Sequence, residues 1–173
     1  MSKCACFSNS LTETNFSERF RMSTCHCNSN TRLHAEENGR KFSIVVHGDR
    51  FDYQFVDKVK VDGFLVDDNI QSRCDYFFRY VHDDKIKNNI FVELKGKNID
   101  KAYDQISQTI KIFKDNDVIA GNSVINGVIV SSRVPNSGGR DREHKEEFRR
   151  KQKGRLEIKT HQAVYNVVRD RVI

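Results

Sequence analysis

A sequence of 173 residues is long enough for one domain and too short for two of ordinary size. Its 30 lysines and arginines exceed its 24 aspartates and glutamates, a formal net charge of +6, and 37% of its residues are hydrophobic. With 9 glycines, 1 proline and apolar residues in strand-length runs, it is not collagen-like, coiled-coil or wholly disordered. No apolar run approaches the roughly 20 residues of a membrane-spanning helix, and the N-terminus lacks the apolar core of a signal peptide. We therefore expect a basic, soluble, cytoplasmic protein with no membrane partner.

The first 40 residues are rich in Ser, Asn, Thr and Cys and poor in aliphatic residues. They contain two C-x-C pairs, Cys4 with Cys6 and Cys25 with Cys27, separated by 18 residues that can loop round to close a site. Four cysteines suit tetrahedral Zn²⁺, and a cytoplasmic protein favours thiolate ligation over disulfides. However, one intervening residue is fewer than the two to four that are usual in zinc sites. A zinc site and a flexible arm with free thiols both remain open.

Two helices are predicted in the same segment. Ser10 to Glu13 match a capping box ahead of Phe16 and Phe20, which are four residues apart. A second, short helix is predicted over Thr31–Asn38, ending at Gly39. We therefore divide the chain into an N-terminal cysteine-rich arm, residues 1–40, and a domain, residues 41–173.

From residue 41 the apolar pattern changes to short strands separated by turn residues, which is typical of an antiparallel meander. A helix follows, because apolar residues recur every three or four positions from Ile99 to Phe113 after the capping residue Asn98. The order of strands, helix, strand, helix and strand indicates an α/β (α+β) fold, with a mixed central β-sheet flanked by helices. The predicted strands are Phe42–Val46, Val59–Val66, Arg73–Val81, Asn89–Gly96, Ser123–Ser132 and one or two within 156–168, and the second helix is Arg140–Arg155.

Three charged residues interrupt the most apolar of these strands: Asp75 in CDYFFRYV, and Glu93 and Lys95 in IFVELKG. Because side chains alternate along a strand, Glu93 and Lys95 project from one face. If the two strands pair, Asp75 approaches Glu93 across the ladder. Two converging carboxylates suit a hard divalent cation such as Mg²⁺, and a lysine beside the cation can assist an attacking water. The alternative is a structural ion pair between Asp75 and Lys95, with Glu93 at the exposed strand end.

This arrangement resembles the PD-(D/E)XK nuclease superfamily, which includes restriction enzymes and Holliday-junction resolvases. The resemblance covers roughly Val59–Ser132 and rests on Asp75 followed by Glu93-Leu94-Lys95 in an apolar strand and then by a helix. It implies a restriction-endonuclease-like fold, with Asp75, Glu93 and the Leu94 carbonyl as ligands of Mg²⁺ or Mn²⁺, and Lys95 as the catalytic lysine. The proline that gives the motif its name is absent, because Cys74 precedes Asp75.

The resemblance also implies two further site residues. Some members of the superfamily supply a glutamate from the first helix as an extra metal ligand, and Glu37 is the first candidate here, beside Glu36 and the more distant Glu18. A solvated helix end explains these acids equally well. Some members use a glutamine in the helix after the motif, and Gln105 matches that position. Periodicity alone is equally compatible with a solvent-facing glutamine.

The segment from Arg140 to Arg155 carries eight lysines and arginines against four acids. It is interpreted either as a solvated helix face with opposite charges side by side or as an element that contacts phosphates. In the second interpretation, the residues that hold the DNA backbone are Arg140, Arg142, Lys145, Arg149, Arg150, Lys151 and Lys153.

The sequence therefore predicts a Mg²⁺- or Mn²⁺-dependent endonuclease that hydrolyses phosphodiester bonds of DNA, in restriction, repair or defence against phage. A homodimer is expected if both strands are cut, since one active site cuts one strand. The alternative is a non-catalytic module that binds nucleic acid or protein, keeps the nuclease-like fold and uses the N-terminal cysteines as a zinc-dependent docking arm.

Overall fold

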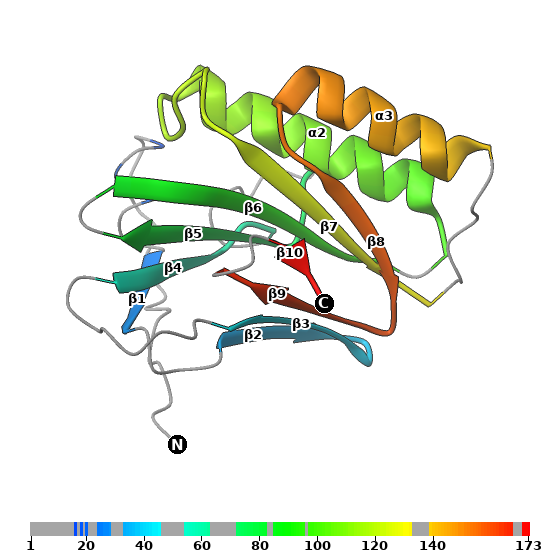
Figure 1. Cartoon of the computed structure of the whole chain (residues 1–173), viewed down its shortest axis with the longest axis horizontal. Helices are drawn as coiled ribbons and strands as arrows, with labels where there is room; N and C mark the ends of the chain where they lie inside the picture. The colour runs from blue at the N-terminus through cyan, green and yellow to red at the C-terminus, as the bar shows by residue number, and fades with distance from the viewer. Residues whose placement is uncertain are drawn as a thin grey trace.

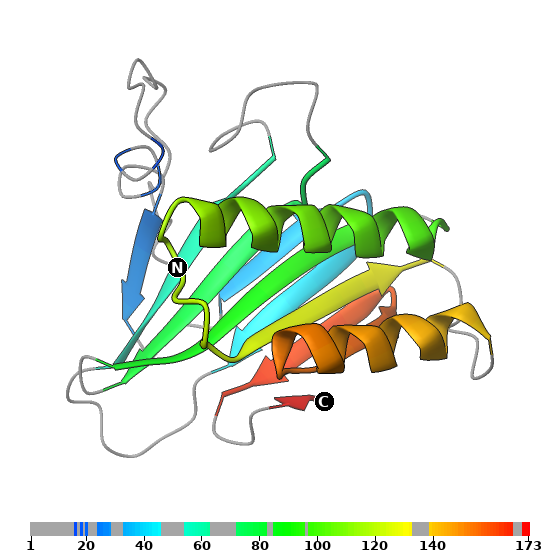
Figure 2. The same cartoon turned by 90° about the horizontal axis from the view of Figure 1, so that it is seen from above.

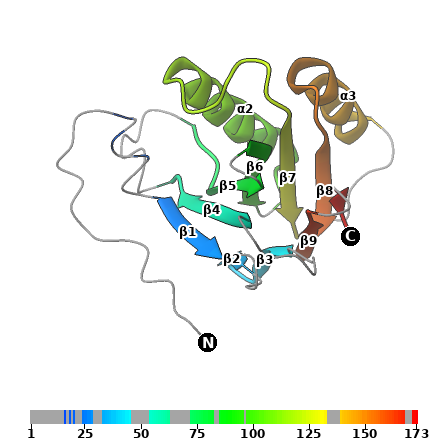
Figure 3. The same cartoon turned by 60° about the vertical axis from the view of Figure 1, so that its left-hand side comes forward.

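The computed structural model describes residues 16, 18, 20, 24–28, 33–45, 54–62, 72–82, 85–95, 97–132, 139–167 and 171–173. This part of the chain forms a mixed α/β fold of three layers (Figure 1). Two helices cover one face of a six-stranded sheet, and a four-stranded sheet covers the other face (Figures 1 and 3). The larger sheet is therefore covered on both faces. None of the described helices is long and apolar enough to cross a bilayer.

The six-stranded sheet has the order β1-β4-β5-β6-β7-β8. The antiparallel pairing of β4, β5 and β6 confirms three strands of the predicted meander, and β7 and β8 are parallel to β6. The edge strand β1, antiparallel to β4, was not predicted, and the predicted first strand of the meander belongs to the other sheet. A parallel pair needs a crossover connection, and the two helices supply it here, one between β6 and β7 and one between β7 and β8. The strands are β1 (Thr24–Asn28), β4 (Gln54–Lys60), β5 (Tyr76–His82), β6 (Lys85–Lys95), β7 (Ile125–Ser131) and β8 (Leu156–Thr160).

The four-stranded sheet has the order β10-β9-β3-β2 and corrects one sequence prediction. The helix predicted over Thr31–Asn38 is wrong, because Leu33–Glu37 is a strand that forms a hairpin with its neighbour. The turn is Asn38-Gly39, and both residues have positive φ, 48° and 74°. Asn-Gly is the preferred pair for such a tight turn, since both residues tolerate this conformation. The strands are β2 (Leu33–Glu37), β3 (Arg40–Val45), β9 (Gln162–Asn166) and β10 (Arg171–Val172).

The second correction concerns β4. The sequence predicts a strand over Val59–Val66, whereas β4 spans Gln54–Lys60 and lies mostly before it. Its valines alternate between the two faces: Val56 packs toward the small sheet, and Val59 packs toward the helices. Two charged residues lie between these valines and hide this alternation in the sequence. Residues 63–71, which include the rest of the predicted strand, lie outside the described part of the chain.

The two helices differ in how they attach to the sheet. The helix α2 (Ile99–Asp115) begins as predicted at Asn98, whose side chain accepts a hydrogen bond from the Lys101 amide at 2.9 Å. It buries a continuous apolar stripe, which the three-and-four spacing predicts. The helix α3 (Arg140–Gln152) buries only Asp141 and Phe148, so most of its surface is polar. The two run side by side across the sheet (Figure 2).

An aromatic cluster connects α2 to the sheet. The Phe113 ring contacts Phe77 of β5 and Phe91 of β6, with ring centroids 4.9 and 5.2 Å apart. Phe16 and Phe20, both helical, pack on Phe113 at 5.8 and 5.6 Å. The predicted pairing of these two residues on one helix face is therefore confirmed, while Ser10 and Glu13 of the predicted cap lie outside the described residues.

Candidate functional site

The pairing of β5 with β6 brings two carboxylates together. The register places Tyr76 opposite Val92, so Asp75, one residue before β5, comes next to Glu93. The Asp75 amide donates a hydrogen bond to Glu93 Oε2 at 3.1 Å, and the Leu94 amide donates to Asp75 Oδ2 at 2.6 Å. Each carboxylate is thus held by a backbone amide from the segment that carries the other. The second oxygen of each group, Asp75 Oδ1 and Glu93 Oε1, accepts neither of these two hydrogen bonds.

Lys95 adds an ammonium group to the carboxylates. It lies two residues beyond Glu93 on β6, so the two side chains share a face of the strand. Lys95 Nζ is 3.2 Å from Glu93 Oε1, an ion pair that is not aligned as a hydrogen bond. The Glu93 side chain has no exposed surface, while 28% of the Lys95 side chain is exposed. Solvent therefore reaches this group from the side of Lys95.

Burial keeps protons on this pair of acids. Loss of solvent and, second, the neighbouring Asp75 together raise the pKa of Glu93 to about 8, while Lys95 opposes the shift. Burial also raises the pKa of Asp75 to about 6, against the hydrogen bond from the Leu94 amide. Glu37 and Asp62 are close enough to add to the second shift by repulsion. At neutral pH the two carboxyl groups thus hold about one proton, which a bound cation would displace.

Glu37, the acid predicted as a further metal ligand, does not join Asp75 and Glu93. Glu37 is the last residue of β2, lies exposed in the small sheet and acts on Asp75 only through its charge. Within the described ranges, no three His, Cys, Asp or Glu side chains lie close enough to hold one metal ion. Glu36 and Glu18 are exposed as well. Of the side chains predicted to ligate a metal ion, Asp75 and Glu93 are therefore the two that the structure brings together.

Gln105 is buried rather than solvent-facing. Its side-chain Nε2 donates to the Arg73 carbonyl at 2.7 Å, and its Oε1 is buried without a hydrogen-bond partner. It therefore contacts the backbone two residues before Asp75. Leu94 lies in β6 beside β7, with its side chain in the core between the sheets, and its amide donates to Asp75. The assignment of its carbonyl as a metal ligand stays a prediction.

Sequence reasoning missed two groups beside the site. The Thr109 hydroxyl on α2 accepts a hydrogen bond from the Cys74 amide at 2.8 Å, and Arg73 Nε lies 2.8 Å from Asp62 Oδ1. A polar threonine within the apolar stripe of α2 was the sequence signal for the first group. The second group had no signal, because the position of Asp62 depends on where β4 ends.

The predicted basic residues do not gather in one place. Arg140 NH1 pairs with Asp100 Oδ2 in the first turn of α2 at 3.2 Å, and Arg142 pairs with Glu146 one turn further along α3. Lys151 pairs in the same way with Glu147, which is the pattern of a solvated helix face. Lys145 is half-buried, and Arg149, Arg150, Lys151 and Lys153 are exposed at the C-terminal end of α3.

The two ends of α3 lie at opposite ends of the sheet. Lys95 pairs with Ser131 at the end of β7, whereas β8, which follows α3, begins opposite Gly127 near the start of β7. Four residues of strand separate these points, about 13 Å. The first turn of α3 therefore lies at the end of the sheet that holds the site, and its basic last turn lies at the other end (Figure 2).

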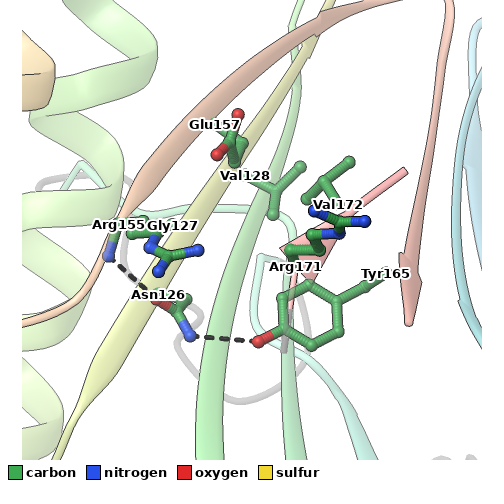
Figure 4. Close-up of a pocket in the computed structure, with 8 residues that line it drawn as sticks. All are labelled: Asn126, Gly127, Val128, Arg155, Glu157, Tyr165, Arg171 and Val172. Carbon is green, nitrogen blue, oxygen red and sulfur yellow. Dashed lines mark hydrogen bonds between the residues drawn. The ribbon is translucent and has the colours of Figure 1, made fainter. Parts of the chain in front are cut away.

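A small pocket also lies at that far end, between β7, β8 and the small sheet (Figure 4). A polar network lies beside it: Asn126 Nδ2 donates to the Tyr165 hydroxyl, and the Arg155 amide donates to Asn126 Oδ1 (Figure 4). Asn126 Nδ2 also donates to Asn88 Oδ1 of β6. These hydrogen bonds fix the two sheets to each other. The pocket is separate from the carboxylate pair, because Asn126 is near the start of β7 and Ser131 is at its end.

The predicted zinc site lies outside the described residues for the most part. Cys25 and Cys27 belong to β1, but their side chains, like Cys4 and Cys6, are not among the described groups. Cys74 is a buried free thiol.

Comparison with known proteins assigns the chain to no family. No protein-family model, curated protein or solved structure matches the chain. The class that its fold and site define is thus a mixed α/β protein with a buried pair of carboxylates and a neighbouring lysine at one end of its larger sheet.

Proposed function

We propose that this protein is a divalent-metal-dependent nuclease with a restriction-endonuclease-like fold. The observation that carries the proposal is the joining of Asp75 and Glu93 across β5 and β6 through reciprocal backbone hydrogen bonds, with Lys95 Nζ 3.2 Å from Glu93. An acid on one strand, an E-x-K on the next and a helix after it is the arrangement of the superfamily that the sequence resembles. A merely structural ion pair would not need two buried acids side by side.

The residues fit a hard divalent cation. Glu93 Oε1 is buried, and the partner that the described residues give it is the Lys95 ammonium at 3.2 Å, which is not aligned as a hydrogen bond. A carboxylate oxygen has more than one lone pair, so it can also accept a cation. Mg²⁺ and Mn²⁺ prefer carboxylate oxygens, with water or phosphate oxygens completing the shell. Asp75 Oδ1 and Glu93 Oε1 would hold the cation, which when bound polarises the scissile phosphate. Leu94 contributes its amide to Asp75 and fixes the direction of that carboxylate.

The other groups have roles that follow from their positions. Lys95 is partly exposed and holds its ammonium beside the acids, so it can orient a water for attack or stabilise the charge that develops on the phosphate. Gln105 acts on the backbone before Asp75 rather than on the substrate. The exposed cations of α3 supply contacts to the phosphate backbone of DNA, and a homodimer would supply the second active site for a double-strand cut.

One observation favours a non-catalytic binding module. Two of the four carboxylate oxygens already accept backbone hydrogen bonds, Glu93 is fully buried, and no third acid joins them within the described residues. In this alternative the proton shared by the two acids satisfies the buried pair without a cation. The fold would then present its basic surface to nucleic acid without cutting it.

A cleavage panel separates the two functions. Plasmid, linear, branched and single-stranded DNA, and RNA, are incubated with the wild-type protein in Mg²⁺, Mn²⁺ or EDTA. We expect cutting only with the metals, and a loss of about 100-fold or more in Lys95→Ala with nucleic-acid affinity kept. The matched control is Lys97→Ala, which removes an exposed lysine two residues further along and should cut normally. If the wild type leaves every substrate intact, the binding module is favoured.

A further inference from the structure

The backbone that presents Asp75 is irregular. Residues 72–75 precede β5 and belong to no strand, yet Arg73, Cys74 and Asp75 are all buried. A buried segment without ladder hydrogen bonds must satisfy its amides and carbonyls elsewhere. The Asp75 carbonyl accepts from the Val61 amide at 2.9 Å, on the side of β4. The groups that hold the preceding two residues come from α2.

Thr109 is the group that holds Cys74. Its hydroxyl accepts from the Cys74 amide at 2.8 Å and donates to the Gln105 carbonyl one turn earlier, also at 2.8 Å. The side chain is fully buried, so water cannot replace either bond. The donated bond fixes the hydroxyl proton, and the oxygen lone pair is thereby aimed at the Cys74 amide. Gln105 Nε2 holds the Arg73 carbonyl from the same helix.

We propose that Thr109 is a positioning residue that fixes the Asp75 carboxylate for cation binding. It acts through the backbone: Thr109 fixes the Cys74 amide, and the next residue along the chain, Asp75, is then held in place to receive the Leu94 amide and bind the cation. This inference rests on the proposed function, because it assumes that the carboxylate pair takes a divalent metal. Groups that hydrogen-bond directly to metal ligands typically contribute 10- to 100-fold to metal affinity, and we expect the lower end of that range for an effect through the backbone.

The test measures Mn²⁺ binding directly, without nucleic acid, by titration with electron paramagnetic resonance detection of free Mn²⁺. Thr109→Val keeps the shape of the side chain and removes the acceptor, and we expect the Mn²⁺ Kd to rise about 10-fold. Thr109→Ser keeps the hydroxyl and should restore the affinity to within about 3-fold. Gln108→Ala, at a half-buried neighbouring position of α2, is the control and should bind as the wild type does. A residue that only stabilises the fold would lower the Tm without changing the Kd.

The outcomes distinguish this inference from the function it rests on. If the wild type binds Mn²⁺ and Thr109→Val binds equally well, or if Thr109→Ser binds as weakly as Thr109→Val, only the positioning role is overturned. If the wild type binds no Mn²⁺, both the metal-dependent function and the positioning role are overturned. Should Thr109→Val fail to fold, hydrogen exchange in the wild type decides: the Cys74 amide must exchange slowly, and rapid exchange would overturn the proposal.

Discussion

The buried carboxylate of Glu93 destabilises the fold. Its side chain has no exposed surface, lies beside Asp75 and has a pKa of about 8, far above the usual 4.5 of a glutamate. Because the folded protein holds this proton more tightly than the unfolded chain, the contribution of Glu93 to stability is fully present below pH 4.5 and is lost as the pH rises through 8. Lys95 offsets only part of this penalty. Such a destabilising residue is expected where function requires it.

Glu93→Gln should therefore stabilise the protein while abolishing any cutting. The amide keeps the size of the side chain and removes the charge, so we expect a gain of about 2 kcal/mol or more at pH 9 and little change at pH 4.5. Thermal unfolding followed by circular dichroism across this range measures the difference. Glu36→Gln, at an exposed position of β2, is the control and should show no such trend. Parallel pH profiles for wild type and Glu93→Gln would contradict the assigned shift.

At the scale of single residues, strand alternation was enough to predict that Asp75 and Glu93 approach each other. It placed Glu93 and Lys95 on one face and depended only on the pairing of two consecutive strands. Thr109 could not be assigned in the same way, because its partner is the backbone of a residue 35 positions earlier. The position of Glu37 could not be predicted for a related reason. The segment around it, predicted as a helix, is a strand of the other sheet.

Among the elements, the turn from α3 into β8 is the most tightly constrained. The helix ends at Gln152, its capping residue Lys153 has a left-handed backbone, and Gly154 follows against the start of β7. A Cβ on Gly154 would lie 1.9 Å from the Ile125 carbonyl oxygen and 2.6 Å from its carbon. Backbone atoms cannot move aside as a flexible side chain can. The glycine thus sets how closely the helix end approaches the sheet.

Gly154→Ala should destabilise the protein by about 2–3 kcal/mol, the upper part of the roughly 1–3 kcal/mol typical of overpacking, because the atoms it meets belong to the backbone. Gly121→Ala is the matched control, because nothing lies within 4 Å of a Cβ at that position. Its expected effect is within about 0.5 kcal/mol. Urea unfolding of the three proteins checks both values, and equal midpoints would show that the turn can relax.

The elements themselves were predicted unequally from the sequence. The boundaries of α2 followed from its apolar stripe and its Asn98 cap, which are local signals. The β2–β3 hairpin also had a local signal, Asn38-Gly39, but Gly39 was interpreted as the end of a helix. The start of β4 was missed because Asp57 and Lys58 interrupt its apolar alternation.

For the whole molecule, the separation of charge is the main feature. The acids Asp75 and Glu93 lie at one end of the larger sheet, while Arg149, Arg150 and Lys153 lie at the other. Lys95 and the shared proton offset much of the negative charge at the first end. A nucleic acid held by both ends must extend along α3, whose 13 residues span about 20 Å.

Replacing Arg149, Arg150 and Lys153 together by alanine should weaken binding to duplex DNA and leave Mn²⁺ affinity unchanged. The slope of log K against log salt should fall by up to about 2.7 if each contacts one phosphate. Fluorescence anisotropy over a range of salt concentrations measures the slope. The charge-matched control replaces Lys41, Lys111 and Arg171, which are exposed on three other elements. Equal slopes for the two triple variants would show that net charge, rather than the α3 end, attracts DNA.

The second sheet could not be predicted from the sequence. The run AVYNVV reads as a strand, but its parallel partner β3 lies more than 100 residues earlier, from Lys41↔Gln162 to Val45↔Asn166. Pairing over such a distance is decided by which faces remain uncovered after the rest has folded. The order of strands, helix, strand, helix and strand was correct, while the assignment of all strands to one sheet was not.

The same long-range pairing affects how the chain folds as it leaves the ribosome. Phe42 and Ile44 of β3 are fully covered in the finished protein, yet β9, the neighbour of β3, is synthesised about 120 residues later. At ordinary translation speeds this is a delay on the order of ten seconds. During this delay, the β2–β3 hairpin has an unpaired strand edge and an exposed apolar face. A nascent chain stalled before residue 162 would therefore already contain both acids and the lysine of the candidate site, but it would also be the form most prone to aggregate.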